Sequence, residues 1–330
     1  MTSAKQQARR RPDSTPVAGR PAGGRNPVNR WLRLDQKASP YLYVAPFLVL
    51  VSVFGLCPLL YTAYVSLNRW NLLDSEGHTW VGLGNYRRLL GDPYFWNALG
   101  NTLSIWVLST FPQLLVALGL AQLLHHRMRL RSLFRVGVLL PNVTSVAAVA
   151  LIFALLFGRD YGLVNWVLGL VGVQPVDWSS GRLSSHAAIA TMVTWRWTGY
   201  NALIYLAAMQ AIPRERYEAA SIDGAGAVQQ LRYVTVPGLR PVIIFTVIVS
   251  TIGNLQLVAE PLLFDPARSV GGASGGSDRQ FQTLALYLYE QGFQQFRFGY
   301  AAAVAWTLFL IICVLALAGY LLVRRIRSVD

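Results

Sequence analysis

The 330-residue chain has few charged side chains and almost no lysine. Charged residues make up 13% of it and hydrophobic residues 54%, whereas a soluble domain has roughly a quarter of charged residues. This shortage excludes an ordinary soluble globular protein and indicates a membrane protein. Only Lys5 and Lys37 are lysines, and neither follows a glycine. A phosphate-binding P-loop needs Gly-Lys-Ser/Thr, so the chain is not expected to bind ATP in that way.

Cysteine and histidine are also scarce. Cys57 and Cys313 lie inside apolar runs, so we expect both to be reduced and buried, without a disulfide framework. His125 and His126 are adjacent and would point to different faces of a helix, which argues against a shared metal. Residues 272–276 fit the hydrolase pattern G-x-S-x-G, but all four histidines precede them, and the hydrolase triad needs a later one. No catalytic residue and no metal site is predicted.

What the chain does contain is six apolar runs of about 23 to 27 residues. A helix of this length rises about 35 to 40 Å, which is enough to cross a hydrocarbon core of about 30 Å. We therefore predict an all-α integral membrane protein with six transmembrane helices in a domain that covers residues 41–327. The predicted spans are residues 41–67, 101–124, 135–157, 186–209, 241–264 and 300–323.

The basic residues predict an orientation. Residues 1–40 carry nine Lys/Arg and are rich in Gly, Pro and Ser, which is typical of a disordered tail. With this tail in the cytoplasm, the inside segments hold 20 Lys/Arg, the outside loops hold 8, and Arg196 lies within a span. Cytoplasmic loops carry the excess of Lys/Arg, so both termini and residues 212–241 are predicted to be cytoplasmic. This distribution explains the net charge of +14 without a nucleic-acid partner.

Residues 212–241 form a polar island between the fourth and fifth apolar runs. Pro213 favours a helix that starts at residue 214, and Gly224 and Gly226 predict a turn after residue 222. A second short helix over residues 228–235 would be stopped by the prolines at 237 and 241. By shape alone the island reads as a connecting loop.

The amino-acid sequence of the island is more informative than its predicted helices and turn. From Glu218 the chain reads EAASIDGAGAVQQLRYVTVPGLRP, which closely resembles the EAA signature of MalF-type permease subunits of carbohydrate ABC importers. VGLGNYRRLLGDPYFWNALGNT and TLALYLYEQGFQQFRFGYAAAVAW are similar to the same family, so the resemblance covers about residues 40–327. It implies that the island is the coupling loop that enters a cleft of a separate ATPase. The implied coupling residues are Glu218, Ala219, Ala220, Asp223, Gly224 and Pro237.

The same resemblance implies partners and a location. A second homologous permease, two ATPase subunits that use ATP and Mg, and an extracytoplasmic sugar-binding protein would complete an importer in a bacterial inner membrane. This chain itself would need membrane lipid and no cofactor. WLRLDQKASPYLYVAPF and LQLVAEPLLFD look most like actinobacterial permeases for cello-oligosaccharides. Maltodextrins, lactose, N-acetylglucosamine and glycerol 3-phosphate remain open, because specificity in such systems rests largely with the binding protein.

Polar residues inside the apolar runs are candidates for the translocation path. A charge in hydrocarbon costs at least about 2.5 to 3.5 kcal/mol, so Arg196 and Glu260 are expected to face a partner or a water-filled cavity. They could form a structural ion pair or line the path. The candidate path residues are Arg196, Tyr200, Asn201, Asn254, Gln256 and Glu260, with Trp195 and Trp197 beside them as possible core aromatics.

Two other classes of membrane protein fit the sequence less well. A secondary transporter would carry inverted repeats and ion ligands at mid-membrane, but no convincing internal repeat is visible and the island would have no purpose. A membrane-embedded enzyme would need acids, histidines or metal ligands clustered near one face. Arg196 and Glu260 are the only two such residues that we expect to be buried, which is too few for an active site.

Overall fold

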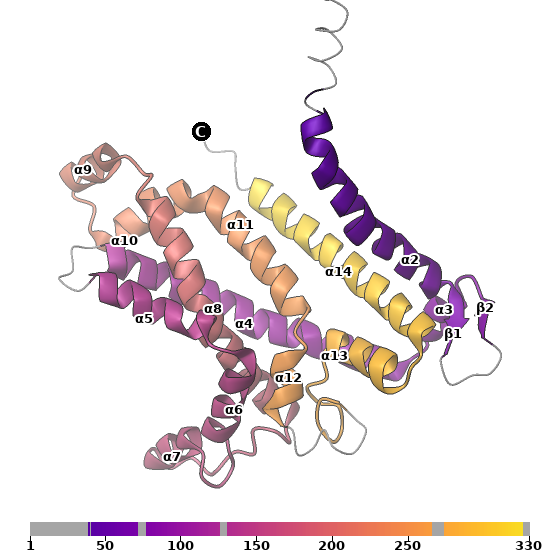
Figure 1. Cartoon of the computed structure of the whole chain (residues 1–330). Helices are drawn as coiled ribbons and strands as arrows, with labels where there is room; N and C mark the ends of the chain where they lie inside the picture. Colours follow the sequence, from indigo (N-terminus) through magenta and orange to yellow (C-terminus); the bar gives the residue numbers. More distant parts are fainter. Residues whose placement is uncertain (1–38, 40, 72–76, 126–130, 266–273, 326–330) are drawn as a thin grey trace, which may run out of the picture. The chain divides into compact units, whose positions relative to one another are not determined.

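The computed structural model describes residues 39, 41–71, 77–125, 131–265 and 274–325. The described chain is almost entirely helical (Figure 1). It divides into two compact units, residues 1–59 and residues 60–330. The predicted basic tail lies outside the described residues except for Ser39.

The first unit carries most of an apolar helix over Tyr41–Ser66, which is long and apolar enough to cross a membrane. A π-helical turn, η1 (Ser52–Leu56), leads directly into α2 (Cys57–Ser66). The Cys57 N–H donates to the carbonyl of Ser52, five residues back, just ahead of Pro58. A proline lacks an N–H and clashes with the carbonyl four residues earlier. The wider turn shifts the hydrogen-bond register there and the helix continues.

The second unit is a helical bundle around four long helices (Figure 1). They are α4 (Pro93–His125), α8 (Arg182–Met209), α11 (Val236–Leu255) and α14 (Phe298–Arg325). A two-stranded antiparallel hairpin precedes them, formed by β1 (Asn68–Trp70) and β2 (His78–Trp80). The shorter elements are α3 (Gly84–Leu90), α5 (Arg131–Val143), α6 (Val146–Leu156), α7 (Leu163–Leu170), α9 (Arg214–Ile222), α10 (Ala227–Gln230), η2 (Leu231–Thr235), α12 (Ala259–Phe264), α13 (Leu284–Tyr289) and η4 (Glu290–Gln294).

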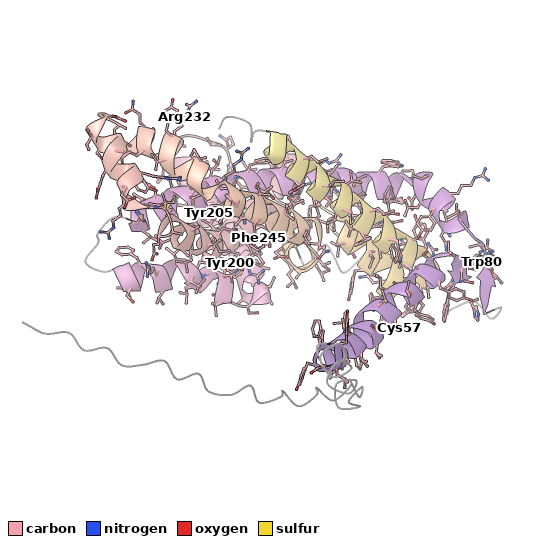
Figure 2. The ribbon with its side chains drawn as sticks, turned by 90° about the horizontal axis from the view of Figure 1, so that it is seen from above. Cys57, Trp80, Tyr200, Tyr205, Arg232 and Phe245 are labelled. Carbon is pink, nitrogen blue, oxygen red and sulfur yellow. The ribbon has the colours of Figure 1, made fainter. Side chains whose placement is uncertain are left out.

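Three groups of buried side chains form the core of this unit. One joins α6, α8 and α12 through residues such as Phe153, Met192 and Phe264. Another joins the start of α4 to α13 and α14 through residues such as Phe95 and Tyr300. The third joins the later halves of α4 and α8 to α11. Figure 2 shows Tyr205 within this third group, where its hydroxyl lies 2.7 Å from Thr246 Oγ1.

Four helices in the described chain are long and apolar enough to span a membrane. They are Tyr41–Ser66, Pro93–His125, Ala227–Leu255 and Phe298–Leu321, near the predicted first, second, fifth and sixth spans. The predicted third span is a pair of helices, Ser132–Val143 and Val146–Leu156, bent by 92°. It would be the fifth candidate if the pair is one span. The predicted fourth span is α8, a single helix of 28 residues whose polar residues, Arg196 among them, lower its hydropathy.

The predicted end of the short helix at Pro237 was wrong. The structure has one continuous helical stretch over Ala227–Leu255 that contains both prolines. The π-helical turn η2 precedes Pro237 by two residues, which is the same arrangement as η1 before Pro58. The predicted fifth span, residues 241–264, also needs correction, because α11 ends at Leu255 and α12 restarts at Ala259.

The two cysteines are free, as predicted, but the prediction that they are buried was wrong. Cys57 and Cys313 are both exposed at the surface of the chain. Cys313 shares its face of α14 with the exposed side chains of Leu310, Val314 and Leu317. An apolar run places thiols inside a membrane, but it does not decide whether they face the protein or the lipid.

Backbone contact fixes α5 against α8 at one glycine. A Cβ added at Gly199 would lie 1.7 Å from the carbonyl oxygen of Val138, so only glycine fits there. This contact lies a few residues before the bend between α5 and α6. It places the bend beside the part of α8 that carries Arg196.

Candidate functional site

The polar island begins with a helix that matches the predicted one. Helix α9 covers Arg214–Ile222, directly after Pro213. It ends in a Schellman turn, in which Gly224 has a φ of +80°. The Ala225 N–H donates to the carbonyl of Ala220 at 2.9 Å, and the Gly224 N–H donates to that of Ser221 at 3.1 Å. Both bonds satisfy carbonyls that the helix leaves unpaired, so the turn has a defined shape.

Neutral hydrogen bonds hold the rest of the island to α9. Gln230 Nε2 donates to Ser221 Oγ at 2.9 Å and to the Ala225 carbonyl at 3.1 Å. The Tyr217 hydroxyl lies 3.0 Å from Thr235 Oγ1. The Gly226 N–H donates to Gln229 Oε1 at 2.8 Å. The segment from α9 to η2 is therefore a folded helix-turn-helix, which we call the coupling segment.

The coupling segment presents its side chains to the outside. Glu218, Ala219, Asp223 and Gly224 are exposed, and Ala220 is half-buried. Apolar side chains are exposed beside them: Ile222 at 87% and Val228 at 78%. Figure 1 shows α9 at the end of the second unit that lies opposite α7. Two carboxylates, small residues and uncovered apolar groups on one rigid tip suit contact with another protein.

Pro237 stands apart from the other coupling residues. It is exposed in the first turn of α11, and next to it a Cβ on Gly238 would lie 2.8 Å from Ile212. This close contact packs the start of α11 against the chain that leaves α8. Pro237 therefore belongs to the base of the coupling segment and not to its exposed tip.

Arg196 and Glu260 form an ion pair. Arg196 Nη1 lies 3.0 Å from Glu260 Oε1, and the two side chains are 15% and 6% exposed. Glu260 lies in the first turn of α12, and Arg196 lies in the middle of α8. The guanidinium also lies 5.5 Å from the ring of Trp197. Its Nε is buried and has no hydrogen-bond partner among the described residues, so one donor is left over.

The other candidate path residues divide into two kinds. Asn254 is buried and donates to Thr110 Oγ1 at 2.8 Å and to Ser109 Oγ at 3.2 Å, so it joins α11 to α4. Asn201 is buried and donates to the Trp197 carbonyl at 3.3 Å. Tyr200 is 39% exposed, and Gln256 is exposed at the break after α11. The structure thus pairs two of the six residues, uses two in packing and leaves two at the surface.

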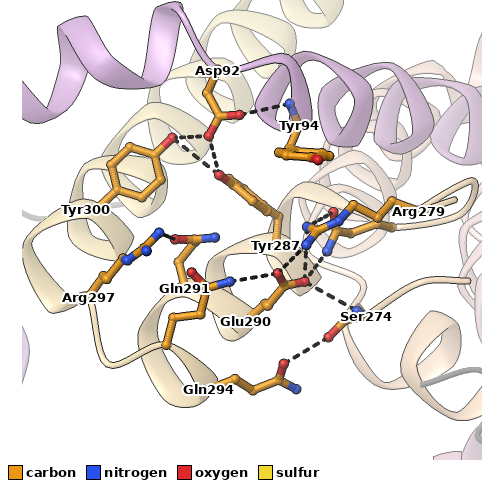
Figure 3. A network of polar contacts seen from close by, with 12 residues as sticks. Asp92, Tyr94, Ser274, Arg279, Tyr287, Glu290, Gln291, Gln294, Arg297 and Tyr300 are labelled. Carbon is orange, nitrogen blue, oxygen red and sulfur yellow. Dashed lines mark hydrogen bonds and ion pairs between the residues drawn. The ribbon is translucent and has the colours of Figure 1, made fainter. Parts of the chain in front are cut away.

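A second polar network, absent from the sequence prediction, lies around α13 and η4 (Figure 3). Glu290 is fully buried, and Arg279 donates to it from Nη2 at 2.7 Å and from Nη1 at 3.2 Å. Gln282 Nε2, Gln295 Nε2 and the Ser274 N–H donate to the same carboxylate. Ser274 thus has a structural role. Gly272 and Ala273, the first two residues of the G-x-S-x-G pattern, fall outside the described residues.

Asp92 anchors the same region to the start of α4 (Figure 3). The hydroxyls of Tyr287 and Tyr300 donate to its Oδ2 at 2.5 and 2.7 Å, and the Tyr94 N–H donates to Oδ1 at 2.9 Å. Burial raises the pKa of Asp92, but these hydrogen bonds outweigh burial and lower it below the ordinary 3.8. Burial and the Asp92 carboxylate raise the pKa of Tyr287. The carboxylate is therefore charged and the Tyr287 phenol neutral near pH 7.

We call residues 274–297, together with Asp92, the cap network. One sequence signal could have found it: Glu290 is an isolated acid after the apolar stretch LALYLY, and an isolated acid beside such a stretch needs a partner. The partner, Arg279, follows a glycine-rich stretch 11 residues earlier in the chain, and the sequence does not show that the two side chains meet.

The family is decided by comparison with known proteins. Residues 113–328 match the model of the family described as binding-protein-dependent transport system inner membrane component. The chain belongs to this family. The coupling segment, the Arg196–Glu260 pair and most of the cap network all lie within the matched residues, so each belongs to the transport domain.

Curated relatives extend the match over most of the chain. The permease is 38% identical over 291 residues to the lactose transport system permease protein LacF of Rhizobium radiobacter, which covers 86% of this chain and 94% of that one. It is 36% identical to the arabinooligosaccharides transport system permease protein AraP of Halalkalibacterium halodurans, which covers 90% and 91%. It is 33% identical to the trehalose/maltose transport system permease protein MalF of Thermococcus litoralis, which covers 92% and 99%.

Solved structures agree on the fold of the permease. A chain of a bacterial ABC transporter involved in the import of the acidic polysaccharide alginate matches with a TM-score of 0.74 at 21% identity. The match covers 91% of this chain and 100% of that one. An alginate ABC transporter in complex with an alginate pentasaccharide-bound periplasmic protein matches with a TM-score of 0.75 at 20% identity, and covers 91% and 99%.

Proposed function

We propose that this permease is a subunit of an ATP-driven ABC importer in a bacterial inner membrane, and that it forms part of the translocation path for a sugar. A second permease, two ATPase subunits and an extracytoplasmic sugar-binding protein complete the importer. The observation that carries this proposal is the coupling segment, a folded and exposed tip on a chain that belongs to a binding-protein-dependent transport family. The ATPase partners use ATP and Mg, and this subunit carries out no hydrolysis.

In this proposal the chain crosses the membrane six times, with both termini and the coupling segment in the cytoplasm. Helix α8 is the fourth span, and the bent α5–α6 pair is the third. The excess of Lys/Arg on one side supports the orientation. Two helices lead into and out of the coupling segment, α8 and α11, and they pack together through Tyr205 and Thr246. A displacement of the coupling segment by the ATPases is therefore passed to both helices.

The proposed path runs past the Arg196–Glu260 pair. Two breaks in regular structure lie in the helices around the pair: the 92° bend between α5 and α6 and the interruption between α11 and α12. Helix α5 also packs closely against α8 at Gly199. Irregular backbone inside a membrane is tolerated where it lines a cavity. The spare Nε donor of Arg196 and the exposed Tyr200 and Gln256 suit the hydroxyl groups and ring faces of a sugar.

For the cargo we propose an oligosaccharide, with cello-oligosaccharide as the first candidate because of the resemblance in sequence. The curated relatives are named for lactose, arabinooligosaccharides and trehalose or maltose, so their names support a sugar and leave the particular sugar open. Maltodextrin and glycerol 3-phosphate are the alternative solutes. Titration of each sugar against the partner binding protein decides among them.

Co-purification tests the proposal directly. A tagged permease extracted from its own membrane should bring down an ATPase and a second permease in stoichiometric amounts, and the reconstituted complex should hydrolyse ATP faster when the loaded binding protein is present. A secondary transporter would purify without an ATPase. That result would refute the proposed function.

The path is tested by Arg196→Met. This change leaves Glu260 buried without its cation, which costs about 3 to 5 kcal/mol when one partner of a buried pair is lost. We expect uptake to fall strongly, and Arg196→Met combined with Glu260→Leu to recover assembly of the complex without recovering uptake. If Arg196→Met left assembly and uptake at wild-type levels, neither a structural role nor a path role would stand.

A further inference from the structure

A polar pocket of about 360 Å³ lies between the start of α4 and the junction of η4 with α14. Three arginines line it: Arg88, Arg279 and Arg297. The other lining residues are Gly91, Asp92, Tyr94, Tyr287, Gln291, Gln295 and Tyr300. None of these is aliphatic, and arginine and glutamine make up half of the lining. The lining therefore favours an occupant with polar or charged groups.

The cap network leaves two of the three arginines without a carboxylate. Glu290 neutralises Arg279 at 2.7 Å, and Asp92 is occupied by the two tyrosine hydroxyls and a backbone N–H. Among the described residues, Arg88 and Arg297 have no carboxylate within ion-pair distance. Their contacts are with neutral groups.

Both free arginines are held in place by these neutral contacts. The Arg88 guanidinium lies 5.2 Å above the ring of Tyr300, and Arg297 Nη1 lies 3.5 Å from Gln291 Oε1. Tyr300 is itself buried and fixed by Asp92. A guanidinium stacked on a ring keeps its N–H groups available for a carboxylate, which it can bind in a bidentate manner. The pocket is thus arranged for an anion before the anion arrives.

The location of the pocket in the permease indicates which molecule supplies the anion. It lies against the buried group around Phe95 and Tyr300, whereas the Arg196–Glu260 pair lies near the group around Met192 and Phe264. It therefore shares no lining residue with the proposed path. We propose that this pocket receives a carboxylate side chain of the extracytoplasmic binding protein and helps to orient that protein on the permease. The inference rests on the proposed function, which supplies the partner and the outward orientation of this end.

The test uses the complete importer in liposomes and its purified, sugar-loaded binding protein. ATP hydrolysis is measured against binding-protein concentration for wild type and for Arg88→Gln/Arg297→Gln. Since loss of interfacial charges lowers the rate of association and its salt dependence, we expect the half-maximal concentration to rise about tenfold, with the same maximal rate. The dependence of that concentration on NaCl should become weaker. Arg88→Lys keeps the charge but loses the planar guanidinium, so its half-maximal concentration should lie between those of wild type and the double variant.

Arg87→Gln is the matched control, because Arg87 is the exposed neighbour on α3 and does not line the pocket. It should leave the half-maximal concentration unchanged. Arg88→Gln alone guards against misfolding, since Arg88 is exposed. The Arg88→Gln variant should show part of the rise in half-maximal concentration that the double variant shows.

Three results would overturn the inference. The first is an unchanged half-maximal concentration in the double variant, and the second is an equal shift of that concentration in Arg87→Gln. The third is a higher sugar concentration needed for uptake by the double variant at saturating binding protein, which would make the pocket a binding site for the solute. If binding protein fails to stimulate even the wild-type complex, the proposed function fails as well. If it stimulates wild type and the double variant equally, only this inference fails.

Discussion

The coupling segment and the cap network are both polar, yet they are built in opposite ways. The coupling segment is exposed, and the described side-chain hydrogen bonds inside it join neutral groups, such as Tyr217 and Thr235. The cap network is buried, and its central contact is the ion pair of Arg279 with Glu290. The charged side chains of the coupling segment, Glu218 and Asp223 among them, remain at its surface. Charge placed at the surface is available to a partner, whereas charge placed inside fixes the fold.

The strongest test of this comparison is Arg279→Met. It leaves Glu290 buried without its cation, and losing one partner of a buried pair costs roughly 3 to 5 kcal/mol. We expect a large fall in the thermal midpoint of the detergent-solubilised permease, measured by tryptophan fluorescence. Arg216→Met, at an exposed site in the coupling segment, is the control and should shift the midpoint little. Equal midpoints for both variants would contradict the contrast between the two regions.

Gly224→Asp tests the tip of the coupling segment. Nothing lies within 4 Å of a Cβ at this position, so the folded permease has room for the side chain and only the left-handed backbone resists it, at roughly 1–2 kcal/mol. We expect uptake to drop about tenfold or more, while insertion into the membrane is unchanged. Gly224→Ala carries at least the same backbone cost without the carboxylate, since Asp adopts the left-handed conformation more readily than Ala, and it should keep more of the uptake. Wild-type uptake in Gly224→Asp would remove this loop from the coupling role.

Tyr217→Phe sharpens the comparison at smaller scale. It removes one neutral hydrogen bond, which contributes about 0.5–1.5 kcal/mol. We expect a small fall in the thermal midpoint that is the same at low and high NaCl. The corresponding effect at a surface ion pair would shrink with salt. A strongly salt-dependent effect of Tyr217→Phe would show that charges hold the coupling segment together.

The smallest expected effect is the response of the cap network to pH. The pKa of Asp92 is lowered below 3.8 in the folded protein, so the unfolded chain binds the proton more readily. Its contribution to stability is therefore full above about pH 4 and is lost as the pH falls through the lowered pKa. Thermal midpoints measured between pH 7 and pH 3 should show an acid-side fall that Asp92→Asn reduces. A fall between pH 7 and pH 5 that Asp92→Asn abolishes would contradict this assignment.

Local signals predicted the coupling segment well. Pro213 and the glycines at 224 and 226 act on their nearest neighbours, and α9 begins and ends where they indicate. The long apolar runs likewise locate the helices, because length and hydropathy are properties of the run itself. The roles of the coupling and path residues stay predictions.

The rest depends on contacts between distant residues. The bend between α5 and α6, the break after Leu255 and the course of the helix through Pro237 and Pro241 are set by packing and by a shift in hydrogen-bond register. The pair of Arg279 with Glu290 requires the loop to fold back on η4. The exposure of Cys57 and Cys313 depends on which face of each helix is covered, and hydropathy alone does not reveal it.

The neutral bonding of the coupling segment has a practical consequence for biochemists. Added salt weakens exposed charge contacts and leaves neutral hydrogen bonds nearly unchanged. In the importer that we propose, a salt titration should therefore weaken the charged contacts between permease and ATPase while the coupling segment keeps its fold. Ionic strength would thus change the affinity between the two proteins without changing the stability of the coupling segment.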